Sequence, residues 1–386
     1  MINELPCSDE QPISFVDLLK NELPDTRDNR GKRHSLVLVI VAYVLAVLVG
    51  RQKLSSIHRF IHNRWAWLCE LTQIPPIKPI SRAHLPRILD GLDWAVLNRL
   101  IECCFGVRIQ CNDGLKWVAI DGKVLRGTLD AGDKQNIVLA VAHETPDVIA
   151  QARQCGEKSS EIPVVRELLK DSGLERQKVT LDAHHLNPIT TSQIHQAGGC
   201  YVIQVKENQA IFLQQCQTMS VSIMPLAETV DHDKAHGRVT TRRAQLFSLT
   251  PLTLDSRWQN SGLSLLMVVT RETFEVSKQK SSDETSYYVS NHRLEPVDAQ
   301  RLTEELAQAI RWHWAVESNN WIRDVTFNED HIKTKAGNQA QVTALLRGLA
   351  ITLIRKVSPK NFQAALDRFA DSTDALKSML WQVKFL

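Results

Sequence analysis

The pattern of apolar and polar positions separates a helical first part of the chain from a later part in which strands and helices alternate. Residues 1 to about 112 have mostly helical periodicity, and an unbroken apolar stretch, LVLVIVAYVLAVLVG, runs from 36 to 50. This stretch is shorter than the roughly 20 residues that a membrane-spanning helix needs. We therefore predict that it forms a helix buried in the core of a soluble protein.

From residue 116 the pattern changes to short segments that are rich in β-branched residues and bounded by turns. They predict strands at 116–125, 136–144 and 148–154, a helix at 161–173, a strand at 178–185, a helix at 188–199 and a strand at 200–206. The order β-β-β-α-β-α-β predicts an α/β fold with one mixed sheet, antiparallel in one part and parallel in another, and with helices on its faces.

The pattern changes again at residue 208. A short helical segment and four strand-like segments with polar turns predict a β-rich insertion at 208–296, and helical patterns return at 297–325 and 338–357. We predict four units. They are a helical N-terminal domain at 1–112, a first part of the core at 113–207, the β-rich insertion at 208–296, and a last part of the core with the C-terminal helices at 297–386.

Composition excludes several classes of protein. The 46 Lys and Arg residues barely outnumber the 43 Asp and Glu residues, so a nucleic-acid-binding surface would need local clustering of basic residues. The 8 cysteines include no C-x-x-C pair, and the opening MINELPCSDEQ is too acidic and polar for a signal peptide. We therefore expect a cytoplasmic protein, and the absence of glycine-rich phosphate-binding motifs predicts no nucleotide cofactor.

Two aspartates stand out at the ends of predicted strands. Asp121 lies in AIDGK and Asp182 in TLDAHH. If both strands are parallel and central, their carboxyl ends meet at one edge of the sheet, where α/β proteins usually place their sites. Two adjacent carboxylates suit a hard cation such as Mg²⁺. Taken singly, each aspartate is better explained as a residue that begins a turn.

Glu317 is the best candidate for a third acid. It lies in the helical stretch RWHWAVESNNW, between Trp314 and Trp321, and such aromatic flanks are unusual on a plain solvated helix face. Asp324, seven residues later, nearly repeats its angular position. A partly exposed acidic helix end explains this spacing equally well.

Six segments carry a family resemblance: AIDGKVLRG, EKSSEIPVVRELL, VTLDAHH, YVIQVKENQ, HGRVTTRR and HWAVESNNWIRDVTFNED. In this order and spacing they resemble the DDE transposases of bacterial insertion sequences, most closely the ISAs-type or H-repeat-associated group. The resemblance covers nearly the whole chain. It implies a ribonuclease-H-like core, interrupted by the β-rich insertion before the last catalytic helix. It also implies that the N-terminal domain at 1–112 binds DNA or is associated with DNA binding.

The resemblance also implies roles for individual residues. Asp121, Asp182 and Glu317 would be the catalytic acids that hold two Mg²⁺ ions, for which Mn²⁺ can substitute, with Asp121 bridging the ions. Contacts to DNA phosphates would come from Lys123, Arg126, Lys206, His236, Arg238, Arg242 and Arg243. For each of these basic residues a solvated surface position is an equally good explanation.

Strand alternation refines the expectation for the insertion. Arg238 and Arg242 share parity, so we expect them to face the catalytic cleft together, whereas Arg243 points to the opposite face.

The chain also departs from the family pattern. Thr240 stands where related sequences usually have an acid, and Ser318 where they have Asn. The stretch from Glu317 to Asp324 is one residue shorter than usual, which leaves the role of Asp324 open. His184 and His185 follow Asp182, but Mg²⁺ prefers oxygen ligands, so a metal role for them is the minority interpretation.

The function implied is that of a DNA transposase. Water would cleave the phosphodiester at a transposon end, and the freed 3′-hydroxyl would then attack target DNA. The expected partner is double-stranded DNA, both the transposon ends and the target, bound by a homodimer or higher oligomer at the bacterial nucleoid and not at a membrane. Two alternatives use the same sequence features: a nuclease of this fold without strand transfer, and a domesticated protein that binds DNA without cutting it.

Overall fold

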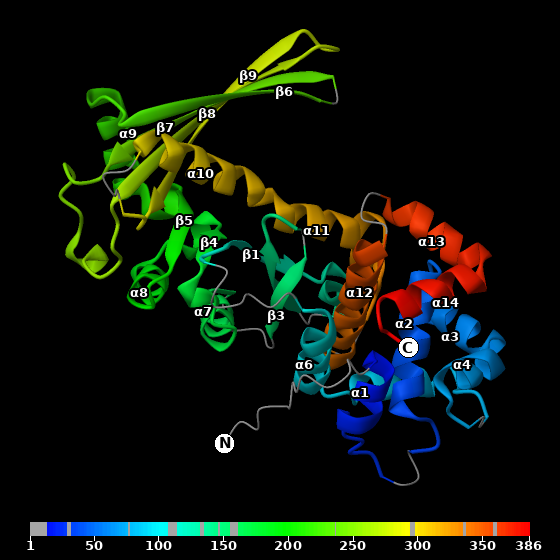
Figure 1. The fold of residues 1–386 in the computed structure, drawn as a ribbon. Helices are drawn as coiled ribbons and strands as arrows, with labels where there is room; N and C mark the ends of the chain where they lie inside the picture. Colours follow the sequence, from blue (N-terminus) through cyan, green and yellow to red (C-terminus); the bar gives the residue numbers. More distant parts are fainter. Residues whose placement is uncertain are drawn as a thin grey trace.

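The computed structural model describes residues 14–28, 32–75, 78–106, 114–131, 135–145, 147–154, 161–235, 237–293, 298–334, 337–357 and 361–386. In this part of the chain a helical body lies beside a large sheet that carries helices on its faces (Figure 1).

The helical body combines both ends of the chain. Its N-terminal helices are α1 (Phe15–Glu22), α2 (Leu36–Leu48), α3 (Leu54–Asn63), α4 (Trp65–Thr72), α5 (His84–Asp90) and α6 (Trp94–Phe105), and its C-terminal helices are α12 (Gly337–Val357), α13 (Phe362–Asp371) and α14 (Thr373–Gln382). All these helices contribute to one hydrophobic cluster. The C-terminal helices therefore share a core with the N-terminal ones.

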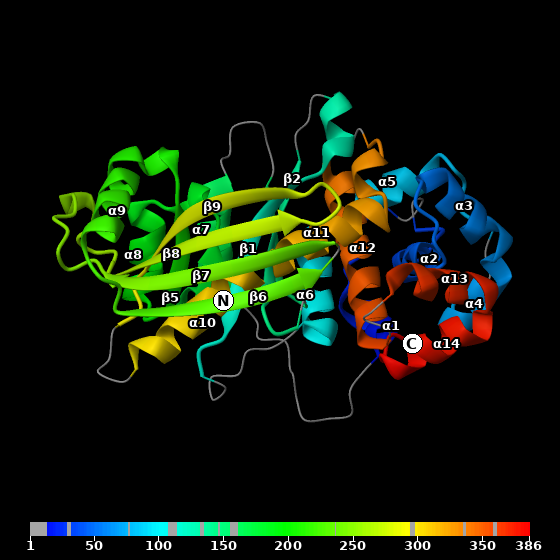
Figure 2. The ribbon, with the colours of Figure 1, turned by 90° about the horizontal axis from the view of Figure 1, so that it is seen from above.

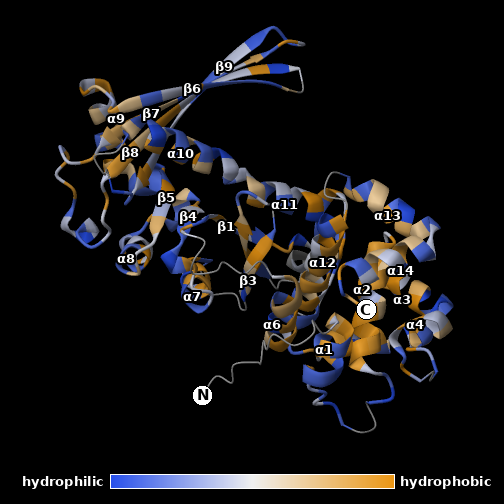
Figure 3. Cartoon of the chain, in the orientation of Figure 1, coloured by the Kyte–Doolittle hydropathy of each residue, from blue (hydrophilic) through white to orange (hydrophobic). Residues whose placement is uncertain are grey.

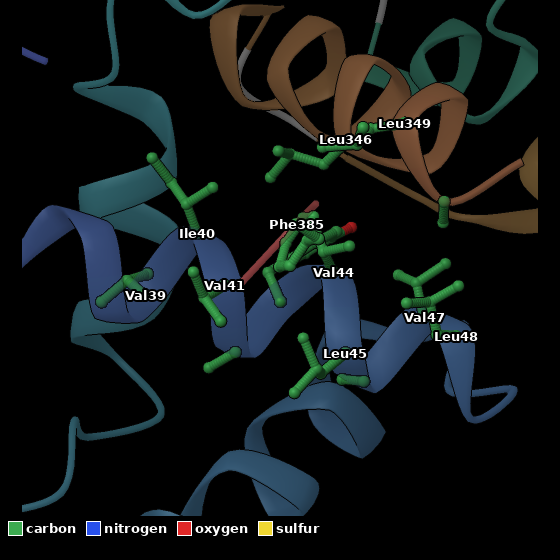
Figure 4. Packing of buried hydrophobic residues seen from close by; sticks show 14 of the residues in the cluster. Val39, Ile40, Val41, Val44, Leu45, Val47, Leu48, Leu346, Leu349 and Phe385 are labelled. Atoms are coloured by element: carbon green, nitrogen blue, oxygen red, sulfur yellow. The ribbon is translucent and has the colours of Figure 1, made fainter. Parts of the chain in front are cut away.

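Helix α2 lies at the centre of this core, and every one of its residues is buried, as the apolar stretch predicts. Ser35 caps its N-terminus by accepting a hydrogen bond from the Leu38 amide, and Gly50, with φ of +76°, follows its C-terminus. Figure 4 shows Phe385 between Val44 of α2 and Leu346 of α12. Hydrophobic colour in Figure 3 gathers around α1, α6 and α12. None of the helices in the described residues is long and apolar enough to cross a membrane.

The described strands form one sheet in the order β3-β2-β1-β4-β5-β9-β8-β7-β6. They are β1 (Trp117–Val124), β2 (Asn136–Ala142), β3 (Val148–Gln154), β4 (Lys178–Leu181), β5 (Cys200–Val205), β6 (Ala227–Ala235), β7 (Arg238–Ser248), β8 (Leu265–Glu275) and β9 (Lys280–Ser290). Strand β4 is parallel to both β1 and β5, and all other neighbours are antiparallel. The prediction of one mixed sheet is confirmed.

The four later strands extend this sheet because β9 pairs with β5. Helix α9 (Ala210–Ser222) precedes them. Seen from above, β6 to β9 run together beyond the other strands toward the helical body (Figure 2).

The two faces of the sheet have separate cores. Val118 and Ile120 of β1 pack with helix α7 (Glu161–Asp171) on one face, and α8 (Pro188–Gln196) covers the same face. Ala119 packs with α12 and with helix α11 (Trp314–Val325) on the other. Helix α10 (Ala299–Trp312) covers β6 to β8 on the α11 side.

The helix predicted at 297–325 is thus two helices, α10 and α11, separated only at His313. The backbone of His313 stays helical, with φ −53° and ψ −29°. Its ring hydrogen-bonds the hydroxyl of Thr180 on β4, 2.9 Å away. The interruption therefore lies where the long helical stretch is held to the sheet.

Candidate active site

Asp121 and Asp182 lie side by side on neighbouring parallel strands. The parallel pairing of β1 with β4 ends at Ile120 and Leu181, so the two aspartates are the next residues on each strand, about 5 Å apart in backbone position. The prediction that Asp121 ends its strand is wrong, since β1 continues to Val124 by pairing with β2. Asp182 does end its strand, and its carboxylate accepts a hydrogen bond from the Ala183 amide at 2.7 Å.

Electrostatics at Asp121 favour a cation. Burial and the nearby carboxylates of Glu161 and Asp182 raise the pKa of Asp121 to about 6. Half-buried carboxylates that repel one another are the donor set that a hard divalent ion such as Mg²⁺ accepts. The residues present therefore fit a metal ion held by oxygen ligands.

Glu161 is an acid that the sequence analysis did not single out. It is the first residue of α7, and its carboxylate lies 2.9 Å from Nε2 of the buried His185. Gly122 makes room for it, because a Cβ at that position would overlap the Glu161 carboxylate. The motif EKSSEIPVV contains Glu161, but nothing in its spacing identifies a partner. His185 is therefore engaged with Glu161, and His184 is exposed.

Glu317 lies on α11 between two residues that contact the strands of the two aspartates. One turn before it, His313 contacts Thr180, which shares a strand face with Asp182. Two turns after it, Asp324 lies 2.5 Å from Lys123, which shares a strand face with Asp121. Glu317 thus lies between two anchor points on the same face of the sheet as the aspartates.

The carboxylates are not gathered into one cluster. Among the described residues, no group of three His, Cys, Asp or Glu side chains is close enough to hold a metal ion. The Glu317 side chain is exposed. The structure therefore brings Asp121 and Asp182 together and positions Glu317 on the adjacent helix without direct contact.

Thr180 also contacts a second histidine. Its hydroxyl lies 2.9 Å from Nε2 of His143, as it does from Nδ1 of His313. Burial lowers the pKa of His143 to about 3 and that of His313 to about 4. Both rings are therefore neutral at pH 7, and the single Thr180 hydroxyl can donate to one ring while accepting from the other.

The basic residues expected near the strand ends have different environments. Lys123 is only 6% exposed and forms ion pairs with Asp324 and Asp330, so it is committed to the protein. Arg126 is 73% exposed beside Asp330. Lys206 is half exposed, with its ammonium 3.5 Å from the Asp182 carboxylate. Arg126 and Lys206 are accessible to a bound phosphate, whereas Lys123 is not.

The arginines of β7 follow the predicted alternation. Arg242 faces α10, where it and Arg311 approach the same two carboxylates, those of Asp231 and Asp233. Arg243 points the other way and pairs with Glu228 at 2.7 Å.

Arg238 and Arg243 are both exposed, although Arg243 is paired with Glu228. Arg238 shares the face of Arg242 and is exposed, whereas Arg242 is held in its carboxylate network and is not free for DNA. His236 lies outside the described residues.

Comparison with known proteins completes the description of the site. The family model described as "Transposase DDE domain" matches residues 114–353, and the model described as "DDE_Tnp_1-associated" matches residues 20–103. The "Putative transposase YncI" of Escherichia coli O157:H7 is 27% identical over 344 residues, which cover 86% of this chain and 85% of that protein. The "H repeat-associated putative transposase YhhI" of Escherichia coli K12 is 27% identical over 362 residues, 90% of this chain and 91% of the relative.

Proposed function

Because the chain belongs to the transposase DDE family, whose domain model spans 114–353, we propose that it cleaves DNA at the ends of a mobile element and joins those ends to target DNA. The observation that carries the proposal is that Asp121 and Asp182 directly follow the last paired residues of β1 and β4, on the sheet face covered by the helix that bears Glu317. The proposed core is ribonuclease-H-like. The strand order β3-β2-β1-β4-β5, with β2 antiparallel to its neighbours, supports this assignment.

The three acids would hold the divalent ions. When bound, two Mg²⁺ ions, or Mn²⁺ in their place, activate the attacking oxygen and stabilise the leaving oxygen of an in-line displacement. Asp121 would be one ligand, since it lies among the carboxylates of Glu161 and Asp182 and is partly buried. Asp182 and Glu317 would supply the other ligands, and the Lys206 ammonium lies 3.5 Å from the Asp182 carboxylate.

Lys123 and Asp324 are positioning residues in this proposal. Their 2.5 Å ion pair joins β1 to α11 two turns beyond Glu317. One turn before Glu317, the hydrogen bond between His313 and Thr180 joins the start of α11 to β4. These two attachments fix the helix and leave the exposed Glu317 side chain free to turn toward the aspartates.

A plasmid assay tests the proposal. The substrate is a supercoiled plasmid carrying both ends of the DNA element that encodes the chain, incubated with protein and Mg²⁺. We expect cleavage at the ends and products in which those ends are joined to new sites. Asp121→Asn and Glu317→Gln should abolish both reactions, because each removes a metal-ligating charge.

The matched control is Glu304→Gln, which removes an exposed acid of α10 away from the aspartates and should leave the reaction intact. Cleavage without joining would support the nuclease alternative. DNA binding by the wild-type protein without cleavage would support the domesticated DNA-binding alternative, and cleavage that survives Asp121→Asn would refute the assignment of the acids.

A further inference from the structure

A cavity of about 410 Å³ opens between the helical body and the segment that follows α11. Its walls come from α2, the start of α3, residues 331–334 and α12. Five of its lining residues are Lys, Arg or His, and none of the described lining residues is acidic; the five are Lys53, Arg82, His331, Lys333 and Arg347. A hollow with cations on its walls and no carboxylate is suited to an anion.

Buried charge behind this cavity is not balanced. Glu329 is the shared partner of two buried guanidiniums, those of Arg323 at 3.3 Å and Arg347 at 3.6 Å. Two cations and one carboxylate leave one positive charge in excess, which is costly for buried groups. The neighbouring group of Lys123 and Arg126 with Asp324 and Asp330 balances itself and offers no spare carboxylate.

Arg347 brings this excess charge to the cavity wall. It is 3% exposed, and its Nη2 lies 3.3 Å from the hydroxyl of Tyr43, another lining residue. Its Nε has no hydrogen-bond partner within the described residues. Arg347 therefore adds positive charge and unused hydrogen-bond donor capacity beside the cavity.

Helix α3 adds unsatisfied donors. The 10-residue helix begins at Leu54 in the cavity wall, and no side chain in the described part of the chain caps it. The Ser56 amide donates to the Lys53 carbonyl, so within the described residues the amides of Leu54 and Ser55 are the first-turn donors left at the cavity wall, at the positive end of the helix dipole. Such amides bind phosphate oxygens well.

The cavity is physically attached to the candidate active site. Asp330, the residue before His331, pairs with Lys123, which is two residues beyond Asp121. The Thr334 amide donates a hydrogen bond to the carbonyl of Gly127 at 3.2 Å, and a Cβ on Gly127 would overlap the Ile332 backbone. The cavity wall is therefore held against β1, the strand that carries Asp121, and against the segment that follows it.

We propose that the cavity binds phosphates of the DNA backbone beside the cleavage site, so that the helical body and the catalytic sheet hold one duplex together. The inference rests on the proposed function for the identity of the ligand. Guanidinium and ammonium groups supply charge-assisted hydrogen bonds to phosphate, and they position the duplex without reading its sequence.

A salt titration of DNA binding tests this site. The double variant Lys53→Ala with Arg82→Ala removes two exposed cations of the lining, so the fold should persist. Its matched control, Lys20→Ala with Arg87→Ala, removes two exposed cations of the same helical body outside the cavity. Affinity is measured by fluorescence anisotropy on a labelled duplex carrying the element end, without Mg²⁺, at several salt concentrations.

We expect the cavity variant to lower the slope of log affinity against log salt by about two, which corresponds to roughly 30-fold weaker binding at 0.15 M salt. The control should change affinity less than about twofold. The same loss is expected on a duplex of unrelated sequence, because phosphate contacts are not sequence-specific. If the alanine pair reduces folding, as judged by circular dichroism, the glutamine pair at the same positions replaces it.

The outcome separates this inference from the proposed function. If the double variant keeps the wild-type salt slope and the wild-type protein cleaves DNA, the cavity assignment alone is overturned. If the double variant has a reduced salt slope but the wild-type protein never cleaves DNA, the result supports the cavity and counts against the catalytic proposal.

Discussion

Replacing Asp121 with Asn should stabilise the metal-free protein while removing its activity. In the folded chain, burial and the neighbouring carboxylates raise the pKa of Asp121 from 3.8 to about 6. The folded state therefore holds a proton more tightly than the unfolded state does. Between about pH 4 and pH 6 the wild-type stability falls as pH rises, and above pH 6 the whole penalty of the ionised carboxylate remains.

The size of the effect follows from the shift. Each pKa unit is worth 1.36 kcal/mol, so a shift of about two units sets an upper bound of about 3 kcal/mol at neutral pH. Because Asp121 is only half-buried, water screens part of this penalty, and we expect Asp121→Asn to raise the free energy of unfolding by roughly 1–2 kcal/mol at pH 8. At pH 4 the variant and the wild type should differ by under about 0.5 kcal/mol.

Urea unfolding in EDTA at both pH values measures this difference. Glu304→Gln is the matched control, because Glu304 is an exposed acid of α10 away from the aspartates. Adding Mg²⁺ should stabilise the wild type and not Asp121→Asn, since an ion bound only by the folded state shifts the equilibrium. A variant that is equally or less stable than the wild type at pH 8, with no pH dependence in the difference, would refute the reasoning.

Three further substitutions test the surrounding framework. Thr180→Val removes the hydroxyl shared by two buried histidines and should lower the free energy of unfolding by about 1–3 kcal/mol, whereas Thr180→Ser should preserve it, as urea unfolding can check. Gly348→Ala places a Cβ 2.6 Å from the buried Arg323 guanidinium and should cost about 1–3 kcal/mol in the same assay; a neutral result would mean that Arg323 can move. Lys123→Met leaves Asp324 without its cation and Asp330 with Arg126 alone, and should reduce cleavage at saturating DNA more than DNA affinity, while the opposite pattern would make Lys123 a DNA contact.

The elements of the sheet could be predicted because they depend on local pattern. Alternating β-branched residues and turn residues placed β1 to β5 within a few residues of their observed ends. The predicted strand at 116–125 already extended past Asp121, but the pattern could not show that this part of β1 pairs with β2. The packing of α12 to α14 against the N-terminal helices could not be predicted either, since an apolar helix face does not specify which other face covers it.

The aspartate pair could be predicted because both residues are tied to strand positions. The ion pairs of the basic residues could not be predicted, because their partners are distant in sequence. Lys123 is held by Asp324, and Arg242 approaches carboxylates that Arg311 also binds, and only the fold brings such groups together. Glu161 has the same explanation, since its closeness to Asp121 arises where α7 begins above Gly122.

The central claim is that Asp121 holds a catalytic metal ion, and a metal-specificity switch tests it most directly. Asp121→Cys replaces a carboxylate oxygen with sulfur, which Mg²⁺ accepts poorly and which the softer Mn²⁺ tolerates better. Cleavage of a duplex carrying the element end is measured with each ion for the wild type and the variant. We expect the variant to be inactive in Mg²⁺ and to recover measurable cleavage in Mn²⁺. Cleavage by the variant at the wild-type rate in Mg²⁺ would show that Asp121 does not hold the ion.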